Sequence, residues 1–244
     1  MLTPKNPATM IGTIDRCWLF AYRSPVEDIK SYLPPLFEPV TYNGYGFWNV
    51  VVSHIDSMRP SVLPKFFGIS YWHAAYRIYV RFRPNNGAPI EGLYFLRSDC
   101  DNEIMSMMGN AVTDFNFNTS PVKVTETAET TEIEIVSRHA RGLAILDHIT
   151  PASLAPGSVF SSVDEAKQFL KYKPNGISAA GESGANIVHI TRKEDEWRSK
   201  LVAVQGAHWD FFKGMNVDFE ICYQVEPIFY KWNKGRIYQW AGAN

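Results

Sequence analysis

Strict alternation along residues 71–83, which read Y-W-H-A-A-Y-R-I-Y-V-R-F-R, is the feature that most constrains the fold of this chain. Successive side chains of an extended strand point to opposite faces, so this stretch predicts one β-strand with two very different sides. One side is apolar and consists of Trp72, Ala74, Tyr76, Ile78, Val80 and Phe82. The other side carries three arginines, a histidine and no acid: Tyr71, His73, Ala75, Arg77, Tyr79, Arg81 and Arg83.

The arginine-bearing side has two interpretations. In the first, it is the outer face of a half-buried antiparallel strand, and its arginines lie in water or pair with carboxylates such as Glu91 across a hairpin. In the second, it lines a closed or cone-shaped sheet in which Arg77, His73 and Tyr79 converge on an anionic ligand. Arginine suits that task because it makes bidentate contacts to carboxylates. A buried cation without a partner is costly, so the second interpretation predicts a bound anion.

Composition favours a single globular domain over residues 1–244 with a sizeable core. The chain has 244 residues, of which 45% are hydrophobic and 14% aromatic. A net charge of −1 and the lack of a basic run argue against nucleic-acid binding. No apolar run approaches the roughly 18 residues of a membrane span, and the N-terminus lacks the apolar segment of a secretory signal. Three widely spaced cysteines fit a reducing, cytoplasmic location.

The remaining pattern predicts a mainly antiparallel α+β fold with about ten strands and three short helices. Asn86-Gly87 predicts a hairpin that joins the strand at 71–83 to a returning strand at about 90–96. A change to helical period predicts a helix near 101–111 that packs on the sheet through Ile104 and Met108. Residues 1–9 read as a loose arm.

Motif searches exclude several common chemistries. No Walker, dinucleotide-binding or H-E-x-x-H pattern is present, and G-E-S-G at 181–184 lacks the spacing of a nucleophile elbow. We therefore expect no cofactor and no metal. His139, His148 and Asp210 read as surface or loop groups.

With these elements laid out, the chain resembles the YqjF-like family of uncharacterised bacterial proteins, which belongs with the acetoacetate-decarboxylase-like fold. The resemblance rests on the order of several segments: L-F-A-Y-R-S-P-V-E-D-I-K-S-Y-L-P-P-L-F-E-P at 19–39, Y-N-G-Y-G-F-W-N-V-V at 42–51, A-Y-R-I-Y-V-R at 75–81 and G-L-Y-F-L-R-S-D at 92–99. His189 and Trp197 fit the family's C-terminal half more weakly. The resemblance implies a closed or cone-shaped, barrel-like sheet with an internal pocket.

Two departures from the decarboxylase pattern affect its chemistry. Acetoacetate decarboxylases use a Schiff-base lysine in a Pro-Lys-Lys stretch, but the matching region here reads F-N-F-N-T-S-P-V-K-V at 115–124, with Lys123 as its nearest lysine. The family glutamate four residues before the central arginine is His73 here. Because histidine is cationic or neutral near pH 7, this exchange alters the proton chemistry of the pocket.

Three functions remain open at this point. The first is a protein that binds a small anion, with His73, Arg77, Tyr79, Tyr71 and Arg81 as candidate ligand contacts. The second is a lyase-type enzyme acting on a small oxo- or hydroxy-acid, with His73 as general acid or base and Arg77 holding the carboxylate. The third is a structural or interaction protein whose arginines are simply paired. The ligand, any reaction, the role of Lys123 and homo-oligomerisation stay open.

Overall fold

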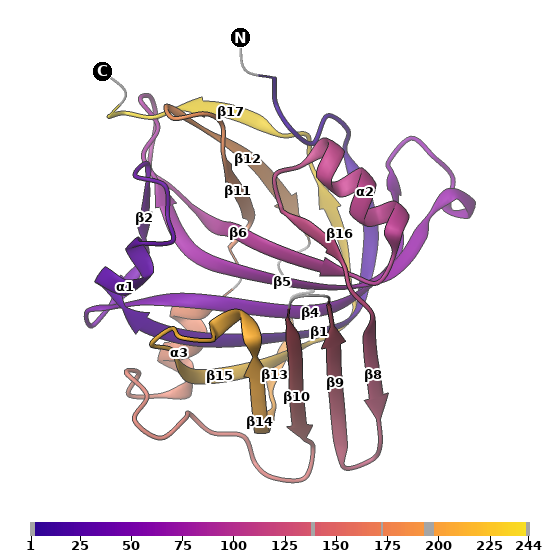
Figure 1. Cartoon of the computed structure of the whole chain (residues 1–244), viewed down its shortest axis with the longest axis vertical. Coiled ribbons are helices and arrows are strands. Elements are labelled where there is room, and N and C mark those ends of the chain that lie inside the picture. Colours follow the sequence, from indigo (N-terminus) through magenta and orange to yellow (C-terminus); the bar gives the residue numbers. More distant parts are fainter. Residues whose placement is uncertain (1–2, 138–139, 172, 193–197, 243–244) are drawn as a thin grey trace.

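The computed structural model describes residues 3–137, 140–171, 173–192 and 198–242 of the chain. The interpretations given above for His139 and Trp197 lie outside these residues. Within them, a large curved sheet and a small four-stranded sheet carry almost all of the fold, with three short helices at the margins (Figure 1). The predicted mainly antiparallel α+β class is confirmed.

The large sheet closes on itself. The long strands β1 and β4 pair along their whole length, and the ring continues from β4 through β5, β6, β11, β12 and β16 back to β1. In the large sheet, β6 pairs in parallel with β11 and with β7, and all the other strand pairs are antiparallel. The ring strands are β1 (Met10–Pro25), β4 (Tyr45–Pro60), β5 (Ile69–Phe82), β6 (Ile90–Cys100), β11 (Asn175–Ala179), β12 (Gly184–Thr191) and β16 (Ile228–Trp232).

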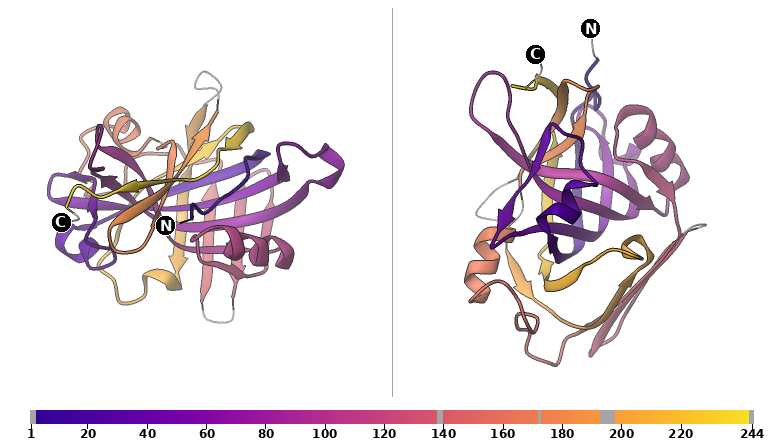
Figure 2. Two further views of the ribbon diagram at one scale, coloured as in Figure 1. Left: turned by 90° about the horizontal axis from the view of Figure 1, so that it is seen from above. Right: turned by 60° about the vertical axis from the view of Figure 1, so that its left-hand side comes forward.

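Shorter strands extend this ring, and the second sheet lies outside it. Attached to the ring are β2 (Phe37–Pro39), β3 (Thr41–Tyr42), β7 (Phe117–Thr119), β13 (Ser199–Leu201), β15 (Asp218–Val225) and β17 (Arg236–Gln239). The small sheet contains β8 (Val122–Glu126), β9 (Thr130–Val136), β10 (Arg141–Asp147) and β14 (Ala203–Trp209). Figure 2 shows the small sheet as a separate layer beside the ring. Short 3-10 turns occupy Lys65–Phe67 and Asp210–Phe212.

The predicted hairpin at the centre of the chain is present. β5 and β6 pair antiparallel, with His73 opposite Cys100, Arg77 opposite Phe95 and Arg81 opposite Glu91. The register shifts once, between Tyr76 and Arg77. Both faces of β5 are buried, because one faces the interior of the ring and the other faces the core shared with the small sheet.

Helices close the two ends of the ring. α1 (Val26–Lys30) follows β1, α3 (Val163–Leu170) packs its Ala166 and Leu170 into the interior core, and α2 (Glu103–Val112) covers the opposite end. Ser162 caps α3 by accepting a hydrogen bond from the Glu165 amide at 3.2 Å. No helix among the described residues is both long enough and apolar enough to cross a membrane.

The predicted packing face of α2 needs correction. Ile104 is 58% exposed, and Met108 is 44% exposed although it borders the ring interior, whereas Met105, Ser106 and Gly109 are buried. Gly109 lies so close to β7 that a Cβ there would be 2.5 Å from the Phe117 ring. The helix therefore approaches β7 with the face that carries Gly109, its smallest residue. The more apolar face, which carries Ile104, is turned toward solvent.

Candidate functional site

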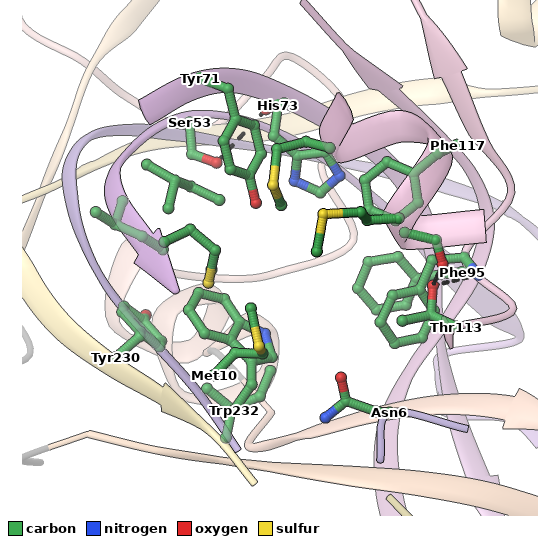
Figure 3. A pocket seen from close by; sticks show the side chains of 18 of the residues that line it. Asn6, Met10, Ser53, Tyr71, His73, Phe95, Thr113, Phe117, Tyr230 and Trp232 are labelled. Carbon is green, nitrogen blue, oxygen red and sulfur yellow. Dashed lines mark hydrogen bonds between the residues drawn. The ribbon is translucent and has the colours of Figure 1, made fainter. Parts of the chain in front are cut away.

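A cavity of about 240 Å³ occupies the α2 end of the ring interior (Figure 3). Its wall comes from the inner faces of β1, β4, β5, β6, β12 and β16, from α2, and from the N-terminal arm. Most of its lining is apolar and includes Met10, Met58, Met105, Met108, Phe95, Phe115, Phe117, Tyr230 and Trp232. The opposite, α3 end of the interior is filled by aromatic rings instead.

The polar part of the wall comes from β5. Tyr71, His73 and Arg77 all line the cavity, because they occupy positions of the same parity on one strand. In Figure 3 the Tyr71 hydroxyl and the His73 ring both point toward the open space. Their ring centroids are 6.4 Å apart. Tyr71, His73 and Arg77 therefore lie on one inner face of β5, as their alternation in the sequence predicts.

His73 is held as a neutral imidazole. Burial lowers its pKa from 6.5 to about 3, and the positive charge of Arg77 lowers it further in the same direction. The ring stacks on Phe117 with centroids 5.4 Å apart. Its Nε2 atom is buried and has no hydrogen-bond partner among the described residues. An imidazole in this state can donate or accept one hydrogen bond, but it is not a cationic acid at neutral pH.

Arg77 supplies a positive charge at the cavity wall. The residue is only 6% exposed, its Nε donates to Asn49 Oδ1 at 3.1 Å, and a second guanidinium nitrogen donates to the same oxygen. Its guanidinium carbon lies 5.3 Å from the centre of the Phe95 ring. The field of Arg77 also acts on Cys17, where burial raises the thiol pKa to about 12 and Arg77 partly opposes that rise. Arg77 therefore makes this wall favourable for an anion.

Tyr71 contributes an uncharged donor. Burial raises its pKa well above the usual value, so the phenol stays protonated across the physiological range. In the part of the chain that the structure describes, its hydroxyl has no hydrogen-bond partner, so it can bind a ligand without losing a bond. Two other cavity hydroxyls are already occupied: Ser53 donates to the His73 carbonyl at 3.4 Å, and Thr113 donates to the Gly109 carbonyl at 2.7 Å.

Tyr79 and Arg81 lie away from the cavity, which corrects the prediction that they share it. β5 has 14 residues and is roughly 46 Å long at about 3.3 Å per residue, so it extends beyond the hollow end of the ring. The Tyr79 hydroxyl donates to the Leu170 carbonyl of α3 at 2.9 Å. Arg81 pairs with Glu91 at 2.7 Å, as the first interpretation of this face expected. One face of β5 therefore matches both interpretations: it borders an internal cavity at Tyr71, His73 and Arg77, and it carries a paired arginine at Arg81.

No lysine among the described residues lines the cavity. Lys123 lies on β8 in the small sheet, exposed and opposite Glu134. From the stretch expected to hold a Schiff-base lysine, Phe115 and Phe117 reach the cavity instead. Likewise, the described residues contain no group of three or more His, Cys, Asp or Glu side chains that could hold a metal ion.

The N-terminal arm is part of the site. Asn6, Pro7 and Ala8 line the cavity. Asn6 is only 7% exposed, so the expectation that this arm is loose is wrong here. The Asn6 side chain donates to the Asn233 carbonyl at 2.7 Å, and its backbone amide donates to the carbonyl of Val112 at the end of α2. The arm therefore lies as a strap between α2 and the segment after β16.

Comparison with known proteins places this geometry in a wider group. Residues 13–216 match the family DUF2071, described as "Uncharacterized conserved protein (COG2071)". None of the curated proteins searched matches the chain. Similar solved structures include acetoacetate decarboxylase from Legionella pneumophila, with a TM-score of 0.61 and 11% identity over 97% of this chain and 89% of that one.

Two further structural neighbours are also enzymes by name. One is an acetoacetate-decarboxylase-like enzyme from Sphingomonas wittichii RW1, with a TM-score of 0.59 and 10% identity over 96% of this chain and 94% of that one. The other is the enduracididine biosynthesis enzyme MppR in complex with pyruvate, with a TM-score of 0.56 and 11% identity over 97% of this chain and 91% of that one. At these identities the likeness shows the fold, and the expected acetoacetate-decarboxylase-like architecture is confirmed.

Proposed function

We propose, from the premise that this chain belongs to the DUF2071 family of uncharacterised conserved proteins, that it binds a small organic acid or similar anion in the cavity without forming a Schiff base. One observation carries the proposal. Arg77, His73 and Tyr71 lie at same-parity positions of β5 on the wall of a mostly apolar cavity, and no described lysine joins them. Arg77 provides the charge, while Tyr71 and His73 provide neutral hydrogen-bonding groups.

The burial of Arg77 supports ligand binding over a purely structural role. A solvated strand face would leave its arginines in water, but Arg77 is 6% exposed and borders an internal space. Arg81 and Arg83, on the same face, pair with Glu91 and Glu38 near the surface. The structural alternative therefore accounts for Arg81 and Arg83. Of the three arginines on this face, only Arg77 is part of the binding proposal.

Binding can be tested with Arg77→Met, which keeps side-chain length and removes the charge. A thermal-shift screen of small carboxylates should identify compounds that stabilise the wild-type protein, and calorimetry should then show at least a tenfold loss of affinity in Arg77→Met, since a hydrogen bond to a charged group contributes about 1.5–3 kcal/mol. Arg83→Met is the matched control, because Arg83 shares the face but pairs with Glu38 at 2.9 Å outside the cavity. Equal losses in both variants would exclude Arg77 as the anchor.

The non-covalent part of the proposal has its own test. Borohydride treatment of the protein with acetoacetate or pyruvate, followed by mass spectrometry, should give no adduct, because a Schiff base requires an amine in reach of the ligand. A stoichiometric adduct on Lys123 would contradict the proposal and restore decarboxylase-like chemistry.

The enzyme alternative makes a different demand on His73. As a neutral imidazole it can act as a base but supplies no acid, unless a bound anion raises its pKa by opposite charge. Turnover of an oxo- or hydroxy-acid that disappears in His73→Gln, while binding of the same acid persists, would favour the enzyme. Equal binding and no turnover in either protein would favour the binding protein.

A further inference from the structure

We propose that the ligand of this cavity is an aromatic monocarboxylic acid about the size of phenylacetate. This inference rests on the proposed function, which places an acid in the cavity, and it adds the chemical class of the remainder of the molecule. Three features of the cavity carry it: its volume, its aromatic and thioether lining, and the presence of Tyr71, His73 and Arg77 together on one strand.

The volume fits one ring and a short acid. A cavity of about 150 Å³ lined by apolar side chains is large enough to bind benzene. The present cavity of about 240 Å³ exceeds that by roughly 90 Å³, which leaves room for a carboxylate and one or two linking atoms. Pyruvate or acetoacetate would fill only part of this space and would leave apolar wall unpaired.

The lining provides flat faces and adaptable sulfur atoms on opposite sides of the open space. Phe95 and Phe115 stack with centroids 4.1 Å apart, and Phe117 stands beside them. Figure 3 shows Phe95 and Phe117 across the space from Tyr230, Trp232 and Met10. Aromatic rings attract one another in offset or edge-on arrangements, and methionine sulfur contacts ring edges favourably. A planar ring gains from this lining more than a flexible chain does.

The polar groups allow one acid and disfavour a second. The groups able to receive a carboxylate lie on β5, whereas Ser53 and Thr113 already bond to backbone carbonyls. Among the described residues Arg77 is the one lysine or arginine that lines the cavity, so a second carboxylate would be buried without a positive charge beside it, which is unfavourable. The geometry thus selects a monoacid with its carboxylate at β5 and its ring toward α2.

Calorimetry at pH 7.5 with five compounds tests this proposal. Phenylacetate should bind at least tenfold more tightly than pyruvate, since burying the ring adds more than the 1.4 kcal/mol that corresponds to a factor of ten. It should also bind at least tenfold more tightly than phenylacetamide, which has the same shape and no charge. Octanoate has the same number of carbon atoms without a ring, and phenylsuccinate adds a second carboxylate; both should bind more weakly than phenylacetate.

The location is tested by a matched pair of variants on α2. Met108 lines the cavity and is 44% exposed, so Met108→Trp can narrow the cavity without overfilling a closed core. Met107 is 74% exposed and does not line the cavity. Met108→Trp should weaken phenylacetate binding at least tenfold, and Met107→Trp should leave it unchanged. Unchanged affinity in Met108→Trp would overturn the inference.

The outcomes separate this inference from the function on which it rests. If pyruvate binds as tightly as phenylacetate, or octanoate binds more tightly, the aromatic class is wrong while the anion-binding function stands. Phenylsuccinate binding as tightly as phenylacetate would overturn the monoacid. If phenylacetamide binds as tightly as phenylacetate, the cavity does not recognise the negative charge of an acid, and both proposals fail. If no compound binds, both fail as well.

Discussion

The two faces of β5 are both buried, but one packs in a core and the other borders a cavity. The outer face meets the small sheet in a dense core, where Ala74, Ile78, Val80 and Phe82 are fully buried. The inner face changes along its length, from Tyr79 packed at the α3 end to Tyr71 and His73 beside a cavity at the α2 end. Burial alone therefore does not separate core from site; the difference lies in whether space remains next to the buried side chain.

The two ends of the ring interior show why space remains at only one of them. At the α3 end, Phe47, Phe160 and Phe169 contact one another with centroids 5.1–5.7 Å apart and fill the interior. At the α2 end the covering helix contributes no aromatic ring to the cavity, because its lining residues are Met105, Met108, Gly109 and Val112. The fold is thus closed by packing at one end and left hollow at the other.

The largest expected effect separates the two faces of β5 by stability. Ile78→Ala removes a fully buried side chain from the dense outer core and should lower the free energy of unfolding by about 2–5 kcal/mol. Tyr71→Phe removes a hydroxyl without a described partner and should change it by less than about 1 kcal/mol, because no hydrogen bond is lost. Urea unfolding monitored by circular dichroism measures both. A comparable loss in Tyr71→Phe would mean that the inner face is also a dense core.

The next effect concerns pH and depends on His73. Among the described residues, the titratable groups that line the cavity with it are Tyr71 and Arg77 on β5, Cys17 on β1 and Tyr230 on β16, and Cys100 on β6 lies opposite it in the sheet. Its folded pKa of about 3 lies below the unfolded value of 6.5, so the unfolded chain takes up the proton first as pH falls. His73 should therefore cost up to about 1.4 kcal/mol of stability per pH unit between pH 6.5 and pH 3.

This contribution can be isolated by comparing wild type with His73→Gln across that pH window. Carboxylates elsewhere titrate equally in both proteins, so the difference between the two stability curves reports His73. The free energy of unfolding of the wild type minus that of His73→Gln should decrease as pH falls from 6.5, because only the wild type loses stability through this group. Parallel curves would show that His73 is accessible to protons in the folded state, and the neutral-imidazole description would be wrong.

The sequence predicted the strand, its two faces and the hairpin, because alternation and hairpin chemistry are local, whereas the closed architecture was implied by the family resemblance. It did not predict where along the inner face the cavity ends, since that depends on how far β5 extends past the covering helices. It also missed the cavity lining from β1: the register of β1 shifts near Ile14, so Ile14 and Cys17 both face inward although their positions differ in parity. Simple alternation cannot find such residues, and the bulge left no clear signal.

The packing of α2 was mispredicted for a related reason. The apolar stripe through Ile104 and Met108 has helical spacing, but spacing does not say which stripe approaches the sheet. Gly109 decides this by allowing contact with Phe117. A lone glycine in a helix was therefore the informative residue.

A smaller effect is expected at the N-terminal strap that lines the cavity. Asn6 has φ of 59°, a left-handed conformation that asparagine tolerates and alanine disfavours by about 1–2 kcal/mol. Asn6→Ala should release the strap and speed hydrogen exchange at the Gly235 amide, which donates to the Asn6 carbonyl at 3.0 Å. Asn6→Gly keeps the backbone conformation and loses only the side-chain bonds, so it should show a smaller increase. Equal exchange in all three proteins would show that the strap is held without Asn6.

The smallest expected effect tests whether the two arginines of one face differ as their surroundings do. Arg81 and Glu91 have side chains that are 38% and 32% exposed, so water screens their 2.7 Å ion pair. Arg81→Met should therefore cost less than about 1 kcal/mol of stability, the usual range for exposed pairs, and Lys173 remains 2.7 Å from Glu91 to balance its charge. Carboxylate affinity should stay at the wild-type value, in contrast to the tenfold loss expected for Arg77→Met. If Arg81→Met weakened the same carboxylate as strongly, the positive charge of the whole strand face would bind the anion, and the cavity wall at Arg77 would have no special role.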